Sequence, residues 1–138
     1  IIYDQKNHAC LIDGIRLHNG RKFAFKHNNI EHLELQLKRA VKTHNPDHGM
    51  IMVIVDGLYS MHGELAPLDK IAQLKKKYDF ALFVDDSHAF GVFGEHGCGA
   101  PEHFDVEADV DIYVSTFTKA FGNLGGFVAA KKDIIDYI

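Results

Sequence analysis

The sequence predicts an α/β protein of three-layer αβα architecture, in which helices cover both faces of a mostly parallel sheet. Two observations carry this prediction. Short apolar runs alternate along the chain with segments whose apolar residues recur at helical spacing. Some of these runs are apolar without interruption, which is typical of parallel strands that are covered on both faces. Strands and helices that alternate in this way build a parallel sheet with helices packed on it.

In the first half of the chain the predicted order is strand, helix, strand, helix, strand. The first helix ends near Asn19-Gly20, a turn signal. The second helix begins after Asn28-Asn29, a plausible cap, and ends before Asn45-Pro46. Its expected buried stripe consists of Ile30, Leu33, Leu37 and Val41. The other four predicted elements are Ile1–Tyr3, Ala9–Leu17, Arg21–Lys26 and Met50–Val55.

The second half of the chain adds one helix and three strands. Pro67 favours the start of a helix, because its fixed φ and its missing N–H suit the first turn. On one side of this helix the sequence places Leu68, Ile71, Leu74 and Tyr78. The three further apolar runs, all predicted as buried strands, are Phe80–Val84, Ile112–Ser115 and Phe127–Ala130.

Composition narrows the class of protein. The chain has 138 residues, enough for one globular domain, and a net charge of -4. The only basic cluster is Lys75-Lys76-Lys77, which we interpret as a solvated helix face, so nucleic acid is not an expected partner. Cys10 and Cys98 are too few for a disulfide framework, and no stretch is apolar for long enough to span a bilayer. We therefore expect a reduced, cytoplasmic protein without a membrane span in this segment.

The first residues, Ile1-Ile2-Tyr3-Asp4, carry neither Met nor a signal-peptide pattern and resemble a strand already in progress. We therefore expect the sequence to be a segment of a longer protein.

Polar side chains follow several of the predicted strands. In open α/β sheets ligands bind beyond the carboxyl ends of the strands, so these positions are candidates for a site. Four strands would deliver polar groups to one edge of the sheet. The candidates are His8, Ser60, Asp85, His88, Thr116 and Lys119.

Each candidate also has a simpler explanation. A lone lysine is usually a surface residue, and an Asp after a strand is usually a turn or helix cap. Ser60 and Thr116 could be ordinary turn hydroxyls, and His8 could cap the helix that follows it. Asp86, next to the candidate Asp85, is predicted to be structural or solvent-facing. Because all six candidates are expected at one edge of the sheet, we favour a common ligand-binding site over a separate structural explanation for each residue.

At these residues the chain resembles the α-oxoamine synthases, a family of fold-type I pyridoxal phosphate enzymes that includes the serine palmitoyltransferases and the 8-amino-7-oxononanoate, 2-amino-3-ketobutyrate and 5-aminolevulinate enzymes. The resemblance covers nearly the whole chain, and its segments occur in the family's order. It implies that residues 1–138 are the central part of the large cofactor-binding domain, with the N-terminal segment and the small C-terminal domain absent. The matching segments are Asp4 to Ala9, Gly57 to Gly63, Ala66 to Leu68, Val84 to Gly91, Gly94 to Gly97, Thr116 to Gly122 and Gly125-Gly126.

The resemblance implies a role for each candidate around pyridoxal 5'-phosphate. Lys119 would form a Schiff base with the cofactor and then act as the base that moves the substrate's α-proton. Asp85 would face the pyridine nitrogen and keep it protonated, which makes the ring an electron sink. His8 would lie flat on the ring. The remaining contacts would come from His88 and Ser60 at the phenolic oxygen, and from Thr116 and Thr118 at the phosphate.

The implied reaction joins an amino acid to an acyl-CoA thioester, releases CoA and then, in most family members, carbon dioxide, and yields an α-amino ketone. The stretch Thr116 to Gly122 looks most like that of serine palmitoyltransferases, which favours serine and a long-chain acyl-CoA without deciding among the family's activities. The family also implies a homodimer whose subunits share the active site.

Two other classes stay open. An aminotransferase or aldolase-like enzyme of the same fold would use Lys119 and Asp85 but no CoA thioester. A non-catalytic partner subunit, or a fragment unable to bind the cofactor, is the second alternative. Retention of Lys119 argues against the partner subunit, since a subunit without chemistry needs no such lysine.

Two suggestive features are set aside. The run His44-Asn45-Pro46-Asp47-His48 holds ligand-type residues, but Pro46 breaks the helical spacing that a metal site would need, so no metal is expected. Cys98 lies between Gly97 and Gly99, where many family members carry arginine, and no His–Asp pair is placed to activate it. We interpret Cys98 as a passive loop thiol.

Overall fold

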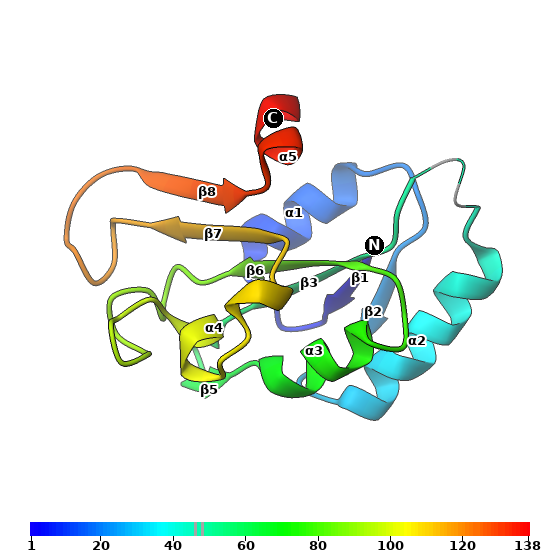
Figure 1. The fold of residues 1–138 in the computed structure, drawn as a ribbon, viewed down its shortest axis with the longest axis horizontal. Coiled ribbons are helices and arrows are strands. Elements are labelled where there is room, and N and C mark those ends of the chain that lie inside the picture. Colours follow the sequence, from blue (N-terminus) through cyan, green and yellow to red (C-terminus); the bar gives the residue numbers. More distant parts are fainter. Residues whose placement is uncertain (46, 48) are drawn as a thin grey trace.

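The computed structural model describes residues 1–45, 47 and 49–138. Strands and helices alternate along the chain, as the sequence predicts (Figure 1). In chain order the elements are β1 (Ile2–Asp4), α1 (Ala9–Leu17), β2 (Phe23–Phe25), α2 (Ile30–Thr43), β3 (Met52–Asp56), β4 (Leu58–Tyr59), β5 (Glu64–Leu65), α3 (Leu68–Lys75), β6 (Ala81–Asp85), α4 (Ala100–His103), a 3₁₀ turn (Glu107–Asp109), β7 (Ile112–Thr116), β8 (Gly126–Ala130) and α5 (Lys132–Tyr137).

Six strands form one sheet in the order β2-β1-β3-β6-β7-β8. All neighbours are parallel except β7 and β8, which are antiparallel. The short strands β4 and β5 pair with each other as a separate hairpin. The predicted mostly parallel sheet is therefore confirmed.

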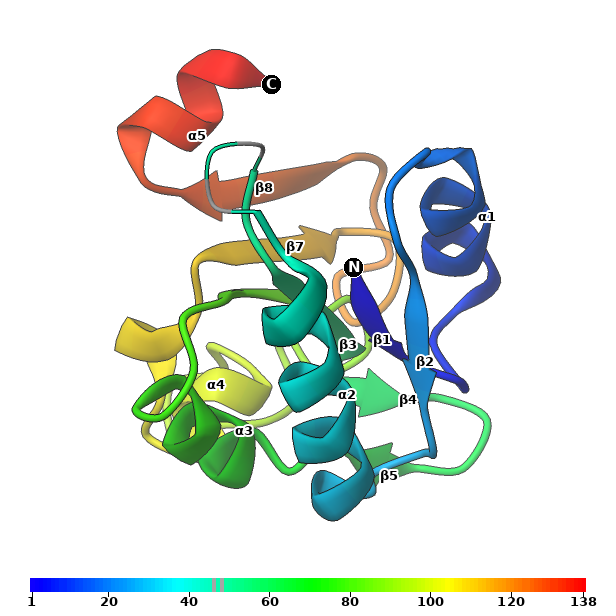
Figure 2. The same ribbon diagram turned by 90° about the vertical axis from the view of Figure 1, so that its right-hand side faces the viewer.

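Helices cover both faces of the sheet. Figures 1 and 2 show α2, α3 and α4 on one side and α1 on the other. The main core lies on the side of α2 and α3, where every second residue of the central strands is buried. Fully buried residues of this core are Ile2, Val53, Val55, Leu82 and Val84 from the strands and Leu33, Leu37 and Leu68 from the helices.

Helix α2 begins as predicted but turns a different stripe to the core. The side chain of Asn29 caps it by accepting a hydrogen bond from the His32 N–H at 2.7 Å. Ala40 is buried, whereas Val41 is 49% exposed, so the prediction for Val41 is wrong. Ala40 follows Leu33 by seven residues, two helical turns, whereas Val41 is rotated about 100° further around the axis.

Helix α3 ends earlier than its apolar pattern suggests. It ends at Lys75, so Tyr78 lies beyond it and donates a hydrogen bond to Glu34 of α2 at 3.0 Å. Of the three consecutive lysines, Lys76 and Lys77 are exposed as predicted. Lys75 is not a solvated residue, because it is half-buried and its Nζ lies 2.5 Å from Oδ2 of Asp111.

Strand β8 is not the buried strand that its apolar sequence predicts. Among the described residues it pairs only with β7, and Gly126, Val128 and Ala129 are exposed. The apolar run alone could not distinguish a central strand from an edge strand, because that depends on which neighbours are present.

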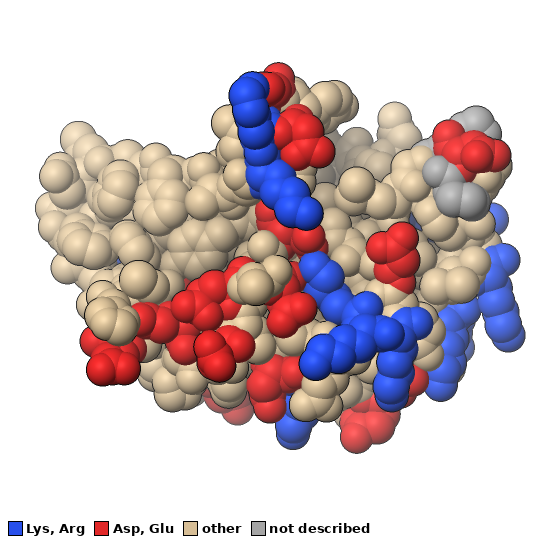
Figure 3. All heavy atoms as spheres, viewed as in Figure 1, with Lys and Arg blue, Asp and Glu red and all other residues tan. Residues whose placement is uncertain are grey.

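Charged side chains are unevenly distributed over the surface. Figure 3 shows Asp and Glu gathered over the region of α4 and Lys and Arg over the region of α3, while neither is seen on this face at the end of the molecule formed by β7 and β8. None of the helices in the described part of the chain is long and apolar enough to cross a membrane.

Asp86 connects the loops at the carboxyl ends of the strands through hydrogen bonds. It is fully buried, and its Oδ2 accepts hydrogen bonds from the Ala100 N–H at 3.0 Å and the Tyr113 hydroxyl at 2.8 Å. Gly57 and Gly99 border the carboxylate so closely that a Cβ at either position would lie within 2 Å of it. The structure thus confirms the structural reading of Asp86 and excludes the solvent-facing one.

Gly99→Ala is expected to destabilise the protein, whereas Gly14→Ala should not. A Cβ on Gly99 would lie 1.7 Å from Oδ2 of Asp86, and the φ of 97° is unfavourable for alanine. Together these effects should cost about 2–4 kcal/mol. At Gly14, inside α1, an added Cβ would have no atom of the described residues within 4 Å, so alanine there should gain about 0.5–1 kcal/mol through helix propensity. Thermal unfolding of both variants measures the difference, and an equal midpoint for the two would contradict this packing.

Candidate active site

The parallel strands end together at one edge of the sheet. The register pairs Tyr3 with Ile54, Asp56 with Asp85, and Asp85 with Val114. The segments that follow these strands therefore begin side by side, and each carries predicted site residues. This edge is where an open α/β sheet binds ligands.

Three of the predicted residues line one cavity of about 420 Å³ at this edge. They are His8, Ser60 and His88, which come from three different loops. Asp56 and Tyr59 also line the cavity. Their common position supports the prediction that these three residues gather at one edge of the sheet.

Lys119 and His88 are in direct contact although they are 31 residues apart in the sequence. Lys119 Nζ lies 2.6 Å from His88 Nε2. Burial, and then the positive charge of Lys119, hold the pKa of His88 below its ordinary value. A neutral His88 can therefore accept a hydrogen bond from the Lys119 ammonium.

His8 caps α1 and also faces the site. Its Nδ1 accepts a hydrogen bond from the Cys10 N–H at 3.3 Å and lies 3.0 Å from the Cys10 Sγ. The centroids of the His8 and His88 rings are 6.4 Å apart. The capping role that the sequence left as an alternative is therefore present, and it fixes His8 beside His88.

Asp85 is the last residue of β6 and is half-buried. Its Oδ1 accepts a hydrogen bond from the Ser87 N–H at 3.1 Å, so the carboxylate also acts as a turn cap. Beside it in the register lies Asp56, the last residue of β3 and 5% exposed. Burial raises the pKa of Asp56 to about 7, and the nearby Asp85 and Asp4 carboxylates act in the same direction.

Sequence reasoning missed Asp56 as a candidate. A signal was available, because Asp56 follows the apolar run Met50–Val55 just as Asp85 follows Phe80–Val84.

Thr116 is the last residue of β7, and Thr118 lies in the turn that leads to β8. The Thr116 hydroxyl donates to the Gly125 carbonyl at 2.9 Å, accepts from the Thr118 N–H at 3.2 Å, and lies 3.0 Å from the Thr118 hydroxyl. These bonds are those of a turn hydroxyl. A phosphate contact by Thr116 or Thr118 stays a prediction.

The structure brings the site residues together to different degrees. His8, Ser60 and His88 share the cavity, and Lys119 joins them through His88. Asp85 is connected to the cavity through its strand neighbour Asp56. Thr116 and Thr118 are the most separate, since among the described residues their side chains bond only within their own turn.

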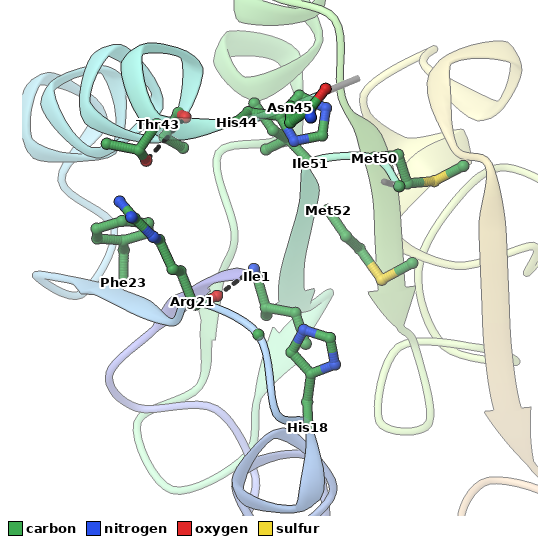
Figure 4. Close-up of a pocket in the computed structure, with 13 residues that line it drawn as sticks. Ile1, His18, Arg21, Phe23, Thr43, His44, Asn45, Met50, Ile51 and Met52 are labelled. Atoms are coloured by element: carbon green, nitrogen blue, oxygen red, sulfur yellow. Dashed lines mark hydrogen bonds between the residues drawn. The ribbon is translucent and has the colours of Figure 1, made fainter. Parts of the chain in front are cut away.

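A larger cavity, of about 580 Å³, lies at the opposite ends of the strands. Figure 4 shows Ile1, Arg21 and Met52 at its wall, and the Ile1 amino group donates to the Arg21 carbonyl at 2.8 Å. None of the predicted site residues lines it. The candidate site is thus the smaller cavity, because the chemical groups gather there.

The structure describes part of the run His44 to His48 and all of the loop around Cys98. Pro46 and His48 lie outside the described residues, so the interpretation of that run is not tested; elsewhere in the described chain no group of three metal-ligating side chains occurs. Cys98 is a free, exposed cysteine whose backbone N–H donates to Glu102 at 2.9 Å.

The whole chain, residues 1–138, matches the family model described as aminotransferase class I and II. The chain therefore belongs to this family of enzymes.

The particular relatives carry the names of α-oxoamine synthases, which confirms the resemblance found in the sequence. A cysteate-C-fatty acyltransferase of Capnocytophaga ochracea is 44% identical over 138 residues, an 8-amino-7-oxononanoate synthase of Thermosipho melanesiensis 46%, and a serine palmitoyltransferase of Bacteroides thetaiotaomicron 41%. Each match covers 100% of this chain but only 33–34% of the relative. The chain thus spans about a third of the length of these proteins.

Solved structures of serine palmitoyltransferases resemble this chain in fold. A serine palmitoyltransferase of S. paucimobilis, solved with a bound PLP–myriocin aldimine, superimposes with a TM-score of 0.86 at 33% identity. The superposition covers 98% of this chain and 34% of that one. The fold is therefore that of the fold-type I large domain, as predicted.

Lys119→Ala is expected to raise the pKa of His88 while leaving it below its ordinary value. The Lys119 charge is one of the causes that lower this pKa, but burial is the larger cause and remains. NMR titration of the His88 imidazole, in protein free of cofactor, measures the change. Lys132→Ala, on α5, is the matched control and should leave the His88 pKa where it is; an unchanged pKa in Lys119→Ala would refute the contact.

Proposed function

We propose that the protein containing this chain is a pyridoxal phosphate-dependent acyltransferase that condenses an amino acid with an acyl-CoA thioester to give an α-amino ketone. The observation that carries the proposal is the contact between Lys119 Nζ and His88 Nε2 at 2.6 Å. It lies at the sheet edge where Asp85 ends its strand. The relatives' names supply the reaction class.

The residues at this edge fit pyridoxal phosphate in their chemistry. An exposed primary amine, which the aldehyde requires, lies beside a neutral imidazole. Asp85 offers a carboxylate to the ring nitrogen, and His8, beside the cavity, offers a flat ring. Hydroxyl groups for the phenolic oxygen and the phosphate would come from Ser60, Thr116 and Thr118. The cavity of about 420 Å³ has the size of a small-molecule site.

When bound, the cofactor supplies a protonated ring that stabilises negative charge on the substrate's α-carbon. The chain's own residues orient the reacting groups and move protons between them. Lys119 removes the α-proton, since its Nζ is the basic group that His88 holds at this edge. Asp85 would hold the ring nitrogen by offering it a carboxylate. His8, fixed as a helix cap, excludes water from one face.

The overall reaction forms a carbon–carbon bond and breaks the carbon–sulfur bond of the thioester, so that free CoA leaves. The carboxylate of the amino acid then leaves as carbon dioxide, and a proton takes its place on the α-carbon, which gives the α-amino ketone. The relatives' names differ in the amino acid or the product, so they support the reaction class more than one substrate pair. The preference for serine and a long-chain acyl-CoA rests on the stretch Thr116 to Gly122 and stays a prediction.

An aminotransferase is the second candidate, favoured by the description of the family model. It would use the same Lys119 and Asp85 but release no CoA. The relatives' names make the acyltransferase the better supported of the two.

The arrangement of the whole protein is also a proposal. We infer that these residues form the central part of the cofactor-binding large domain, because they match about a third of each relative's length. A homodimer with a shared site and a cytoplasmic location stay predictions. The experiments below therefore use the full-length protein.

Borohydride reduction in the presence of pyridoxal phosphate is expected to label Lys119 and no other lysine. The reduction makes the link between amine and aldehyde irreversible, and peptide mapping by mass spectrometry locates it. Lys119→Ala should abolish the label, and Lys131→Ala, an exposed lysine after β8, should not. A wild-type protein that gains no label at Lys119 would refute the enzymatic proposal.

Release of free CoA from an acyl-CoA and an amino acid should fall further in Asp85→Ala than in Ser60→Ala. Loss of the charge that stabilises the reacting centre costs about 10²–10³-fold in rate. Loss of one neutral hydrogen bond costs about tenfold. A thiol assay measures both variants. Transfer of the amino group without any CoA release would support the aminotransferase instead.

A further inference from the structure

Asp56 is a buried carboxylate that the proposed roles leave unused. It ends β3, beside Asp85 in the register, and is 5% exposed. Its side chain lines the cavity that holds His8, Ser60 and His88. A carboxylate in such a position is costly unless hydrogen bonds compensate for its lost hydration.

The compensating bond goes to His8. Oδ2 of Asp56 accepts a hydrogen bond from the His8 backbone N–H at 2.7 Å, the distance of a strong charge-assisted bond. The two residues are 48 positions apart in the sequence, so this bond ties the loop after β1 to the end of β3. The bond is made to the backbone of His8, and the ring of His8 lies beside the ring of His88.

The neighbouring residue strengthens the same connection. The side-chain amide of Asn7 donates to the Ile54 carbonyl in β3 at 2.9 Å, and Asn7 is buried. Residues 7 and 8 are therefore both attached to β3. On the other side of His8, Nδ1 is held by the Cys10 N–H. The backbone of His8 is thus tied to β3, and its exposed ring is held on one side through Nδ1.

We propose that Asp56 is a positioning residue of this site, whose carboxylate sets the place of the His8 ring through the His8 backbone amide. This inference rests on the proposed function, in which His8 covers the cofactor ring. Asp56 acts through His8 and not by touching the cofactor, which separates its role from that of Asp85.

Several groups around Asp56 raise or lower the pKa of its carboxyl group. Burial raises its pKa to about 7, the His8 N–H bond lowers it, and Asp85 at the end of β6 and Asp4 at the end of β1 raise it. Lys119, after β7, acts in the lowering direction. At a pH of about 8 the carboxylate is therefore mainly ionised, and the tests are made there.

A double-mutant cycle between Asp56 and His8 tests the proposal in the full-length protein. Asp56→Ala should weaken binding of pyridoxal phosphate about tenfold, because the bond that holds His8 is lost. In the His8→Ala background the same change should weaken binding less than about twofold, because no ring is left to position. Absorbance titration gives the dissociation constants. Equal factors in the two backgrounds would overturn the proposal.

Two further variants separate positioning from folding and from charge. Asp56→Asn keeps a side-chain oxygen that can accept from the His8 N–H, so it should bind the cofactor within about threefold of wild type. Asp13→Ala removes an exposed carboxylate of α1 that does not bond to His8; it is the control for loss of an acid and should have no effect. If Asp56→Asn is as damaging as Asp56→Ala, charge and not the hydrogen bond matters, and the proposal fails.

A readout without cofactor distinguishes this proposal from the proposed function. Hydrogen exchange of the His8 amide, measured in cofactor-free protein, should speed up at least about tenfold in Asp56→Ala and not in Asp13→Ala. A protein that shows this change but is not labelled at Lys119 would refute the enzymatic function and leave the Asp56–His8 connection standing. Unchanged exchange in Asp56→Ala would overturn the connection itself.

Discussion

The parallel register of β1, β3, β6 and β7 is the constraint on which the rest of the structure depends. Because these strands run in the same direction and in step, the segments after their carboxyl ends begin at one edge of the sheet. This alone brings Lys119 to His88 across 31 residues of sequence. The helices that connect parallel strands must lie on the faces of the sheet, so the core that α2 and α3 form with the strands stabilises the edge as well. The site is a consequence of the sheet's connectivity, as in other open α/β folds.

Buried acids hold this edge in shape. Asp4, Asp56 and Asp86 are each at most 5% exposed, and each accepts hydrogen bonds from backbone N–H groups of neighbouring loops. A buried carboxylate without such donors would cost several kcal/mol, so the acids and the loop conformations depend on each other. The same arrangement explains why glycine is needed at positions 57 and 99, where any side chain would meet Asp86. The reactive groups Lys119 and His88 are less buried and sit on this rigid support.

The sequence was sufficient to predict what depends on local pattern. The six strands of the main sheet, the cap at Asn29, and the gathering of His8, Ser60 and His88 follow from periodicity and from the rule that ligands bind beyond strand ends, whereas the short hairpin of β4 and β5 was not predicted. Features that depend on tertiary neighbours could not be predicted in this way. Strand β8 has a buried strand's sequence but pairs only with β7 among the described residues, and Val41 lies one residue past the core-facing stripe. The bond from Asp56 to His8 joins residues 48 positions apart and becomes visible only when the register is known.

A crystal structure of the full-length protein with pyridoxal phosphate would test directly whether this edge of the sheet is the active site. We expect electron density continuous with Lys119 Nζ, the ring nitrogen at about 3 Å from the Asp85 carboxylate, and the His8 ring against the face of the cofactor. Asp56 should retain its bond to the His8 N–H and stay away from the ring nitrogen. A cofactor bound elsewhere, or a ring nitrogen that faces Asp56 with Asp85 turned away, would contradict the assignment of this edge as the active site.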